Sequence, residues 1–241
     1  MYNMILSTLY VAALAVLFAL VIGVGCALCL ACAATNRQRT LIMPYIDLLA
    51  SIPSVGYGFI GLYIVVKFFE KLGRSTGESI LAGGIVLSVM ILPYMISSCC
   101  DTMVRIRSRY SDASAAMGIS KWYMAGQMIL PASTRGILIS MALATGRAMG
   151  ETMAVMMVMG NSIAFPKLLG KGETISALIA MDMGIAEVGS THYSALYTAG
   201  LVLMVLLFSG ALDVPLDFLR ETFCNFFGRL FGMPYLFNGY I

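Results

Sequence analysis

Charge is scarce in this sequence, and so are the residues on which most enzyme chemistry depends. Charged residues make up only 11% of the 241 residues and hydrophobic residues 60%, whereas a soluble domain carries about 25% charged residues. The chain has one histidine and no G-x-x-x-x-G-K-[ST] loop to hold nucleotide phosphates. These shortages exclude a soluble domain and ATP hydrolysis by the chain itself, and they indicate an integral membrane protein.

Five apolar stretches are long enough to cross a bilayer, whose hydrocarbon core requires about 20 helical residues. They cover approximately residues 4–34, 42–66, 79–100, 133–160 and 195–219. The first lacks the basic n-region of a signal peptide and is too long to be one. We therefore predict an all-α membrane protein, a polytopic bundle of about five transmembrane helices in which residues 1–241 form a single domain.

The distribution of basic residues predicts the orientation. With the N-terminus outside, the inside segments hold nine Lys and Arg residues and the outside segments hold five. Because cytoplasmic loops carry the excess of positive charge, we expect an external N-terminus and a cytoplasmic C-terminus in the cell membrane.

Cysteines at three-residue spacing suggest a metal site only superficially. Cys26, Cys29 and Cys32 lie inside an apolar helix with no histidine or acid nearby. We expect them to pack as small thiols, and we predict no metal site. A nucleophile–base pair is also missing from the spans, which argues against an intramembrane enzyme.

Arg147 and Glu151 are the only charged residues in the stretch 137–165. Arg147 lies about 16 Å along the predicted helix, near the middle of the membrane. The two residues are four apart, so a continuous helix would place them on one face. Two interpretations stay open, a structural ion pair or a polar transport path, because intramembrane ionisable residues serve both purposes.

Small and hydroxylated residues accompany this pair. Gly146 and Gly150 form a G-x-x-x-G pattern, which predicts close approach of another helix. Ser140 lies seven residues before Arg147 on the same stripe, and Thr152 follows Glu151. We predict that Ser140 and Thr152 belong to the same path.

The second predicted span is interrupted near its middle by Pro53, with Gly56 close behind. A broken membrane helix either lines a cavity or is a static kink, and the sequence leaves both open. Asp47, in the same span, is expected to pair with a basic residue near the inner surface.

The cytoplasmic segment 101–131 is too polar to span the membrane, and its capping residues predict a helix–glycine–helix elbow. A first short helix begins at Ser111 or Asp112 and ends at Gly118, and a second runs over Lys121–Leu130, capped by Ser120 and stopped by Pro131. The segment is either a docking device or an ordinary connection.

The external segment 161–194 holds an apolar run, residues 175–186, that is too short to span. We expect a re-entrant or surface helix that closes the outer mouth. Asp182, Glu187 and His192 have no catalytic constellation around them, so structural roles are expected.

The elbow resembles the EAA loop of ABC-importer permeases. Residues 112–118 (DASAAMG) and 128–131 (MILP) keep that loop's glycine six residues after the acid and its Leu-Pro about eighteen after it. Asp112 replaces the usual Glu, Ser114 an Ala, and Met128 an Ile. The resemblance implies that the elbow couples to an ATPase through Asp112, Ala113, Ala115, Ala116, Gly118, Leu130 and Pro131.

Three further segments resemble the phosphate-uptake (Pst) permeases, and PstC more than PstA. They are residues 46–58 (IDLLASIPSVGYG), 146–155 (GRAMGETMAV) and 189–196 (GSTHYSAL). Permeases of this type usually have one more span ahead of the region that begins here near Ser7. The explanations for a shorter start are a misplaced start codon or a dedicated auxiliary subunit.

The resemblance implies a type I importer permease with a cytoplasmic coupling helix. Its expected partners are a homologous PstA-like permease, a PstB-like ATPase dimer, an external phosphate-binding protein and the lipid bilayer, with no nucleic acid. ATP is used by the ATPase, and no cofactor is bound by this chain. Alternatives are a permease for sulfate, molybdate or phosphonate, or a passive anion channel.

Phosphate needs a cation with fork geometry that stays protonated, which Arg147 supplies. Glu151 is expected either to neutralise Arg147 at rest or to accept a hydrogen bond from the P–OH group.

Overall fold

The computed structural model describes residues 1–73 and 76–212, and this part of the chain is helical apart from one isolated bridge between Gly160 and Gly172. The helices are α1 (Tyr2–Cys32), α2 (Asn36–Ala50), α3 (Ser54–Ile60), the π-helical turn η1 (Gly61–Val66), α4 (Lys67–Lys71), α5 (Ile80–Ala116), α6 (Lys121–Met124), the π-helical turn η2 (Ala125–Ile129), α7 (Leu130–Ala132), α8 (Thr134–Gly150), α9 (Met153–Val158), α10 (Ile175–Asp182) and α11 (Thr191–Leu212).

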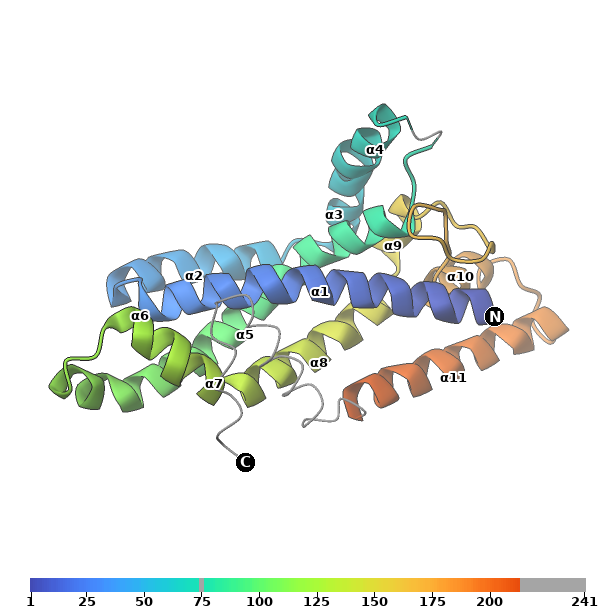
Figure 1. The fold of residues 1–241 in the computed structure, drawn as a ribbon. Helices are drawn as coiled ribbons and strands as arrows, with labels where there is room; N and C mark the ends of the chain where they lie inside the picture. The colour runs from blue at the N-terminus through green and yellow to red at the C-terminus, as the bar shows by residue number, and fades with distance from the viewer. Residues whose placement is uncertain (74–75, 213–241) are drawn as a thin grey trace.

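The two longest helices, α1 and α5, run in the same direction and form the centre of the bundle (Figure 1). Small side chains allow them to approach closely. A Cβ added at Gly84 of α5 would lie 2.9 Å from the Cβ of Leu14 in α1. Close packing of this kind is the main attraction between helices in lipid, where water no longer drives apolar surfaces together.

Three helices of the described chain are long and apolar enough to cross a membrane, namely α1, α5 and α11. Two bent pairs raise this number to five if each pair is one span. Residues 36–50 and 54–71 meet at 87°, and residues 121–132 and 134–150 meet at 61°. The helical fold class is confirmed. The end of the predicted span 195–219, Cys224 and the predicted cytoplasmic C-terminus lie outside the described residues.

Two predicted boundaries are wrong. The third span was expected over 79–100, but α5 continues to Ala116, so the predicted short helix at Ser111 or Asp112 is the last part of α5. No glycine or proline interrupts residues 94–117, and nothing stops the helix earlier. The fourth span was expected over 133–160, but α8 ends at Gly150.

The elbow between α5 and α8 is built by the predicted turn and cap. Gly118 has a φ of +67°, the left-handed conformation that ends helices, and the Ser120 hydroxyl accepts a hydrogen bond from the Tyr123 N–H. Pro131, however, does not stop the second helix, which continues through η2 and α7 to Ala132. Proline is tolerated there because it lies in the first turn of α7.

The elbow and the external loop occupy opposite ends of the bundle (Figure 1). α6 lies at one end, and α10 and the N-terminus lie at the other. The segment of α3, η1 and α4, residues 54–71, which we call the arm, projects away from the long helices (Figure 1). The bundle is therefore complete along its axis, whereas the arm extends to the side.

Candidate translocation path and coupling elbow

Arg147 lies in the last turn of α8, exposed on the surface of the single chain. In residues 1–73 and 76–212, the ion pairs join Lys171 to Glu78 and His192 to Asp182, and Arg147 takes part in neither. Its position at a helix C-terminus favours a positive charge. A guanidinium within a span that has no ion-pair partner must face something more polar than lipid.

The expectation that Glu151 shares a helix face with Arg147 is wrong. Glu151 is the first residue after α8, with extended backbone angles of φ −72° and ψ 129°. Its Oε1 accepts a hydrogen bond from the N–H of Ala154 at 3.3 Å, which caps the start of α9. The Ser176 hydroxyl donates to its carbonyl oxygen at 2.8 Å. Glu151 thus joins α8, α9 and α10 at a chain break.

Ser140 and Thr152, the two hydroxyls predicted beside the pair, are occupied locally. Ser140 is buried and shares a 2.7 Å hydrogen bond with Ser98 of α5. Thr152 is half-buried, and its hydroxyl donates to the carbonyl of Gly150 at 3.4 Å. Ser140 therefore belongs to the α5–α8 contact.

The G-x-x-x-G pattern has no neighbour in the described chain. A Cβ built on Gly146 or Gly150 meets nothing within 4 Å. By contrast, one built on Gly58 of α3 would lie 3.1 Å from the Cα of Ala154 in α9. The predicted close approach at Gly146 and Gly150 is thus absent within one chain, and this surface is free for another one.

The interruption at Pro53 is confirmed, and its free backbone groups are satisfied. α2 ends at Ala50 and α3 begins at Ser54. The Ser51 hydroxyl donates to the carbonyl of Leu48 at 2.7 Å, and the buried Tyr57 hydroxyl donates to that of Leu49 at 2.7 Å. These bonds replace the helical bonds that the break removes, as membrane interiors require. Gly56 continues the turn, its N–H donating to the Pro53 carbonyl at 2.9 Å.

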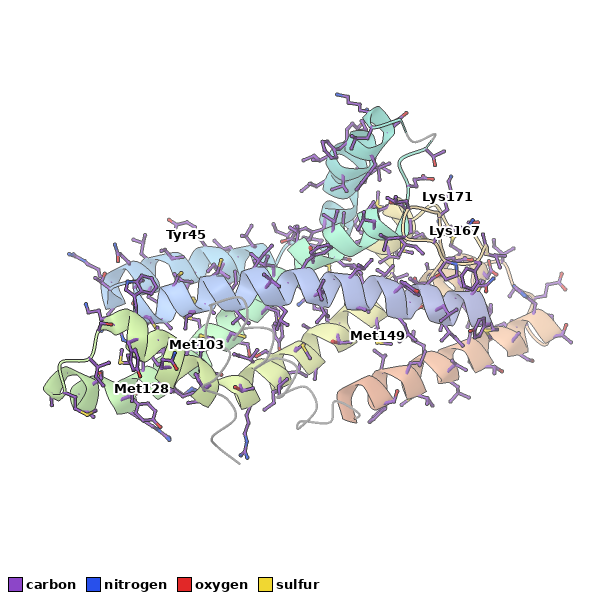
Figure 2. All side chains as sticks on the ribbon, viewed as in Figure 1. Tyr45, Met103, Met128, Met149, Lys167 and Lys171 are labelled. Atoms are coloured by element: carbon purple, nitrogen blue, oxygen red, sulfur yellow. The ribbon has the colours of Figure 1, made fainter. Side chains whose placement is uncertain are left out.

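Asp47 does not pair with a basic residue, contrary to expectation. It lies exposed on α2, and its Oδ1 accepts a hydrogen bond from the Ser97 hydroxyl of α5 at 3.2 Å. Tyr45, two residues earlier, points outward from the same helix (Figure 2). In the described helices, α2 therefore presents a carboxylate that no ion pair neutralises.

The residues predicted to couple to an ATPase divide between surface and interior. The exposed ones are Asp112, Ala113, Ala115, Ala116 and Gly118, whereas Leu130 is buried and Pro131 half-buried. Leu130 and Pro131 therefore hold the elbow on the bundle instead of offering contacts. Buried Ser114 adds to this support, since its hydroxyl donates to the Met124 sulfur at 3.0 Å.

Three large exposed side chains at the elbow were not singled out from the sequence. Met117 is 63% exposed, Trp122 68% and Tyr123 52%. Met128 lies at the same end of the bundle, opposite Lys167 and Lys171 (Figure 2). The signal was present, because the only tryptophan of the chain comes two residues after the capping Ser120.

The external loop is fastened to the start of α5. The carbonyls of Leu168 and Gly170 accept hydrogen bonds from the N–H groups of Leu81 and Ile80. Lys171 forms a 2.6 Å ion pair with Glu78, beside a cavity of about 240 Å³. The amides at this helix end are therefore already paired.

The loop also contains a carboxyl group that sequence reasoning overlooked. Glu173 is only 6% exposed, and no hydrogen bond or ion pair joins it to another described residue. Burial raises the pKa of Glu173, and the nearby negative charge of Asp182 raises it further, while the N-terminal amino group lowers it. Asp182 itself lies 3.3 Å from His192, which ties α10 to α11.

The described cysteines are free thiols. Cys26 and Cys29 are exposed on α1, whereas Cys32, Cys99 and Cys100 are buried among the helices.

Comparison with known proteins bears on the family. Residues 19–222 match the model of the binding-protein-dependent transport system inner membrane component. The chain belongs to this family. It is 33% identical over 237 residues to the phosphate transport system permease protein PstC of Xylella fastidiosa, covering 90% of this chain and 72% of the relative. It is 37% identical to the probable ABC transporter permease protein YqgH of Bacillus subtilis, covering 81% of this chain and 64% of the relative.

These identities confirm the resemblance to PstC permeases. The fold agrees with a solved inward-facing structure of the MetNI methionine ABC transporter, at a TM-score of 0.64 and 17% identity over 92% of this chain and 93% of that one. The fold is thus that of a type I ABC importer permease. The family places the chain among membrane-embedded transport subunits and not among enzymes.

Proposed function

We propose that this chain is the phosphate-conducting permease subunit of an ATP-driven importer, with the N-terminus external. It pairs with a second, PstA-like permease, docks a PstB-like ATPase dimer through the elbow, and receives phosphate from an external binding protein. The observation that carries the proposal is the state of Arg147, an exposed cation within a span and without an ion pair in the described chain. An oxyanion is the partner that its guanidinium fits bidentately.

The surface around Arg147 supports a second permease. Gly146 and Gly150 offer room for a close helix, and the break at residues 51–53 reaches the surface of the single chain. Non-helical backbone is tolerated at membrane depth only when protein covers it or water fills the space beside it. A second permease supplies both conditions, since two such surfaces facing each other enclose a polar path.

The elbow supports docking of an ATPase. It lies outside the long apolar stretches, and yet Met117, Trp122 and Tyr123 are exposed there. Aromatic side chains that project from a capped, packed helix are typical of interface hot spots. Movement of the ATPase subunits reaches α8 directly, because α6, η2 and α7 lead into it through the bend at Ser133.

The test is uptake of labelled phosphate by the reconstituted complex. Arg147→Gln is expected to reduce ATP-dependent uptake at least a hundredfold, because one charged contact within a low-dielectric site is removed, while complex assembly persists. Arg37→Gln, an exposed arginine at the start of α2, is the matched control. Normal uptake by Arg147→Gln would contradict the role of Arg147. Uptake that needs no ATPase would favour a passive channel instead.

A further inference from the structure

Asp47 is a second unneutralised charge within the spans, and the proposed function does not use it. It lies one turn before the end of α2, at the broken part of the span. The Ser97 hydroxyl gives it one hydrogen bond, at 3.2 Å. A carboxylate offers about four acceptor positions, so most of its capacity is unused. An exposed, under-satisfied carboxylate at this depth is too costly to face lipid.

Two chains of contacts connect Asp47 with Arg147. On α5, Ser97 bonds to Asp47, and the next residue, Ser98, bonds to Ser140 of α8. Ser140 is seven residues from Arg147, two helical turns along the same stripe. The acid and the cation thus lie on the two helices that flank one polar face of α5.

The second chain passes through the helix break. The Tyr57 hydroxyl donates to the carbonyl of Leu49, two residues after Asp47. Arg147 is the charged group that acts electrostatically on Tyr57. The break therefore lies between the carboxylate and the guanidinium, and both approach it.

Glu151 is less suited than Asp47 to accept a proton-bearing group from a substrate. One of its carboxylate oxygens is held by the N–H of Ala154, and its backbone carbonyl by Ser176. Moving Glu151 would uncap α9 and loosen its contact with α10. Asp47 has no such structural duty, since its helix ends are capped by other side chains.

We propose that Asp47 belongs to the substrate site and accepts a hydrogen bond from the X–OH group of a protonated tetrahedral oxyanion, while Arg147 binds the unprotonated oxygens. The site then selects phosphate and arsenate, which keep a proton near neutral pH, and rejects sulfate, which has none to donate and is repelled by the carboxylate. Ser97 orients the carboxylate from the side. This inference rests on the proposed function and narrows its substrate class.

The experiment measures anion selectivity without the binding protein, whose own preference would hide that of the permease. Equilibrium dialysis of the purified permease–ATPase complex with labelled phosphate, competed by arsenate or sulfate, gives a ratio of affinities that does not depend on the amount of folded protein. Asp47→Asn is expected to raise the affinity of sulfate relative to phosphate about tenfold, because the amide donates where the carboxylate only accepts. Asp47→Glu keeps the wild-type ratio, and so does the control Asp101→Asn, an exposed acid farther along α5.

The outcomes separate this inference from the proposed function. An Asp47→Asn complex that prefers phosphate over sulfate as strongly as wild type overturns the inference and leaves the function intact. A wild-type complex that binds arsenate but not phosphate, with a preference over sulfate that depends on Asp47, overturns the function and supports the inference. A wild-type complex that binds none of the three anions overturns both.

Discussion

The α1–α5 pair and the surface formed by the arm and the C-terminal part of α8 differ in how far a single chain satisfies them. Along α1 and α5, small residues meet neighbours at contact distance, and the side chains form one buried cluster. On the arm and around Arg147, apolar side chains are exposed, and the glycines at 146 and 150 meet nothing. The first region makes the fold, and the second is suited to another molecule.

The polar groups divide in the same way. Ser140, Glu151 and Tyr57 are bonded within the chain and hold helix ends or contacts together. Arg147 has no ion pair in the described residues, and Asp47 has one hydroxyl donor. Hydrogen bonding alone therefore separates residues that support the site from residues that are available to a substrate.

The largest expected effect comes from the same substitution made in each region. Gly84→Leu should prevent folding or lower stability by about 3 kcal/mol or more, because even a Cβ there approaches Leu14 to 2.9 Å. Gly146→Leu should leave the isolated chain folded and prevent assembly with the second permease. Abundance and melting temperature in detergent measure the first effect, and copurification of the two permeases measures the second.

The comparison fails if the two substitutions behave alike. An equal loss of folded protein would mean that Gly146 packs within its own chain. Normal assembly of the Gly146→Leu chain would mean that the partner lies elsewhere.

A smaller effect is expected at the elbow. Trp122→Ala should weaken the complex with the ATPase by about 2 kcal/mol or more, roughly thirtyfold in Kd, because a large exposed aromatic side chain is removed from the docking surface. Tyr45→Ala on α2 removes a similarly exposed aromatic residue away from the elbow and serves as control. ATPase retention during size-exclusion chromatography is the measurement, and equal retention of both variants would remove Trp122 from the interface.

Apolar length and glycine–proline punctuation were enough to predict the helical class, the break at Pro53 and the turn at Gly118. The end of α8 was missed because residues 153–160 are as apolar as those before Gly150, and hydropathy does not register a chain break inside an apolar stretch. Gly150 followed by Glu151 and Thr152 was the available sign, a glycine helix end next to capping residues.

The candidate site was predictable by residue type but not by pairing. Arg147 stood out from the sequence because charge is rare there. Whether it pairs with Glu151 depended on one backbone turn after Gly150, which extends the chain and assigns the carboxylate to α9. The bond between Asp47 and Ser97 joins residues 50 positions apart, and only the packing of α2 on α5 creates it.

The smallest expected effect concerns Glu173, where the well-packed outer end of the bundle buries a carboxyl group without a hydrogen-bond partner in the described chain. Burial raises its pKa in the folded state above the unfolded value, which is about 4.3. Below that value both states are protonated and Glu173 costs nothing. As pH rises through the folded pKa, the folded state must carry the buried charge, so stability falls. Glu173→Gln should therefore melt at a higher temperature than wild type at pH 7, with the difference vanishing near pH 4. Glu187→Gln, an exposed acid between α10 and α11, should show no such trend. If the Glu173→Gln difference were the same at both pH values, it would reflect packing and not the charge.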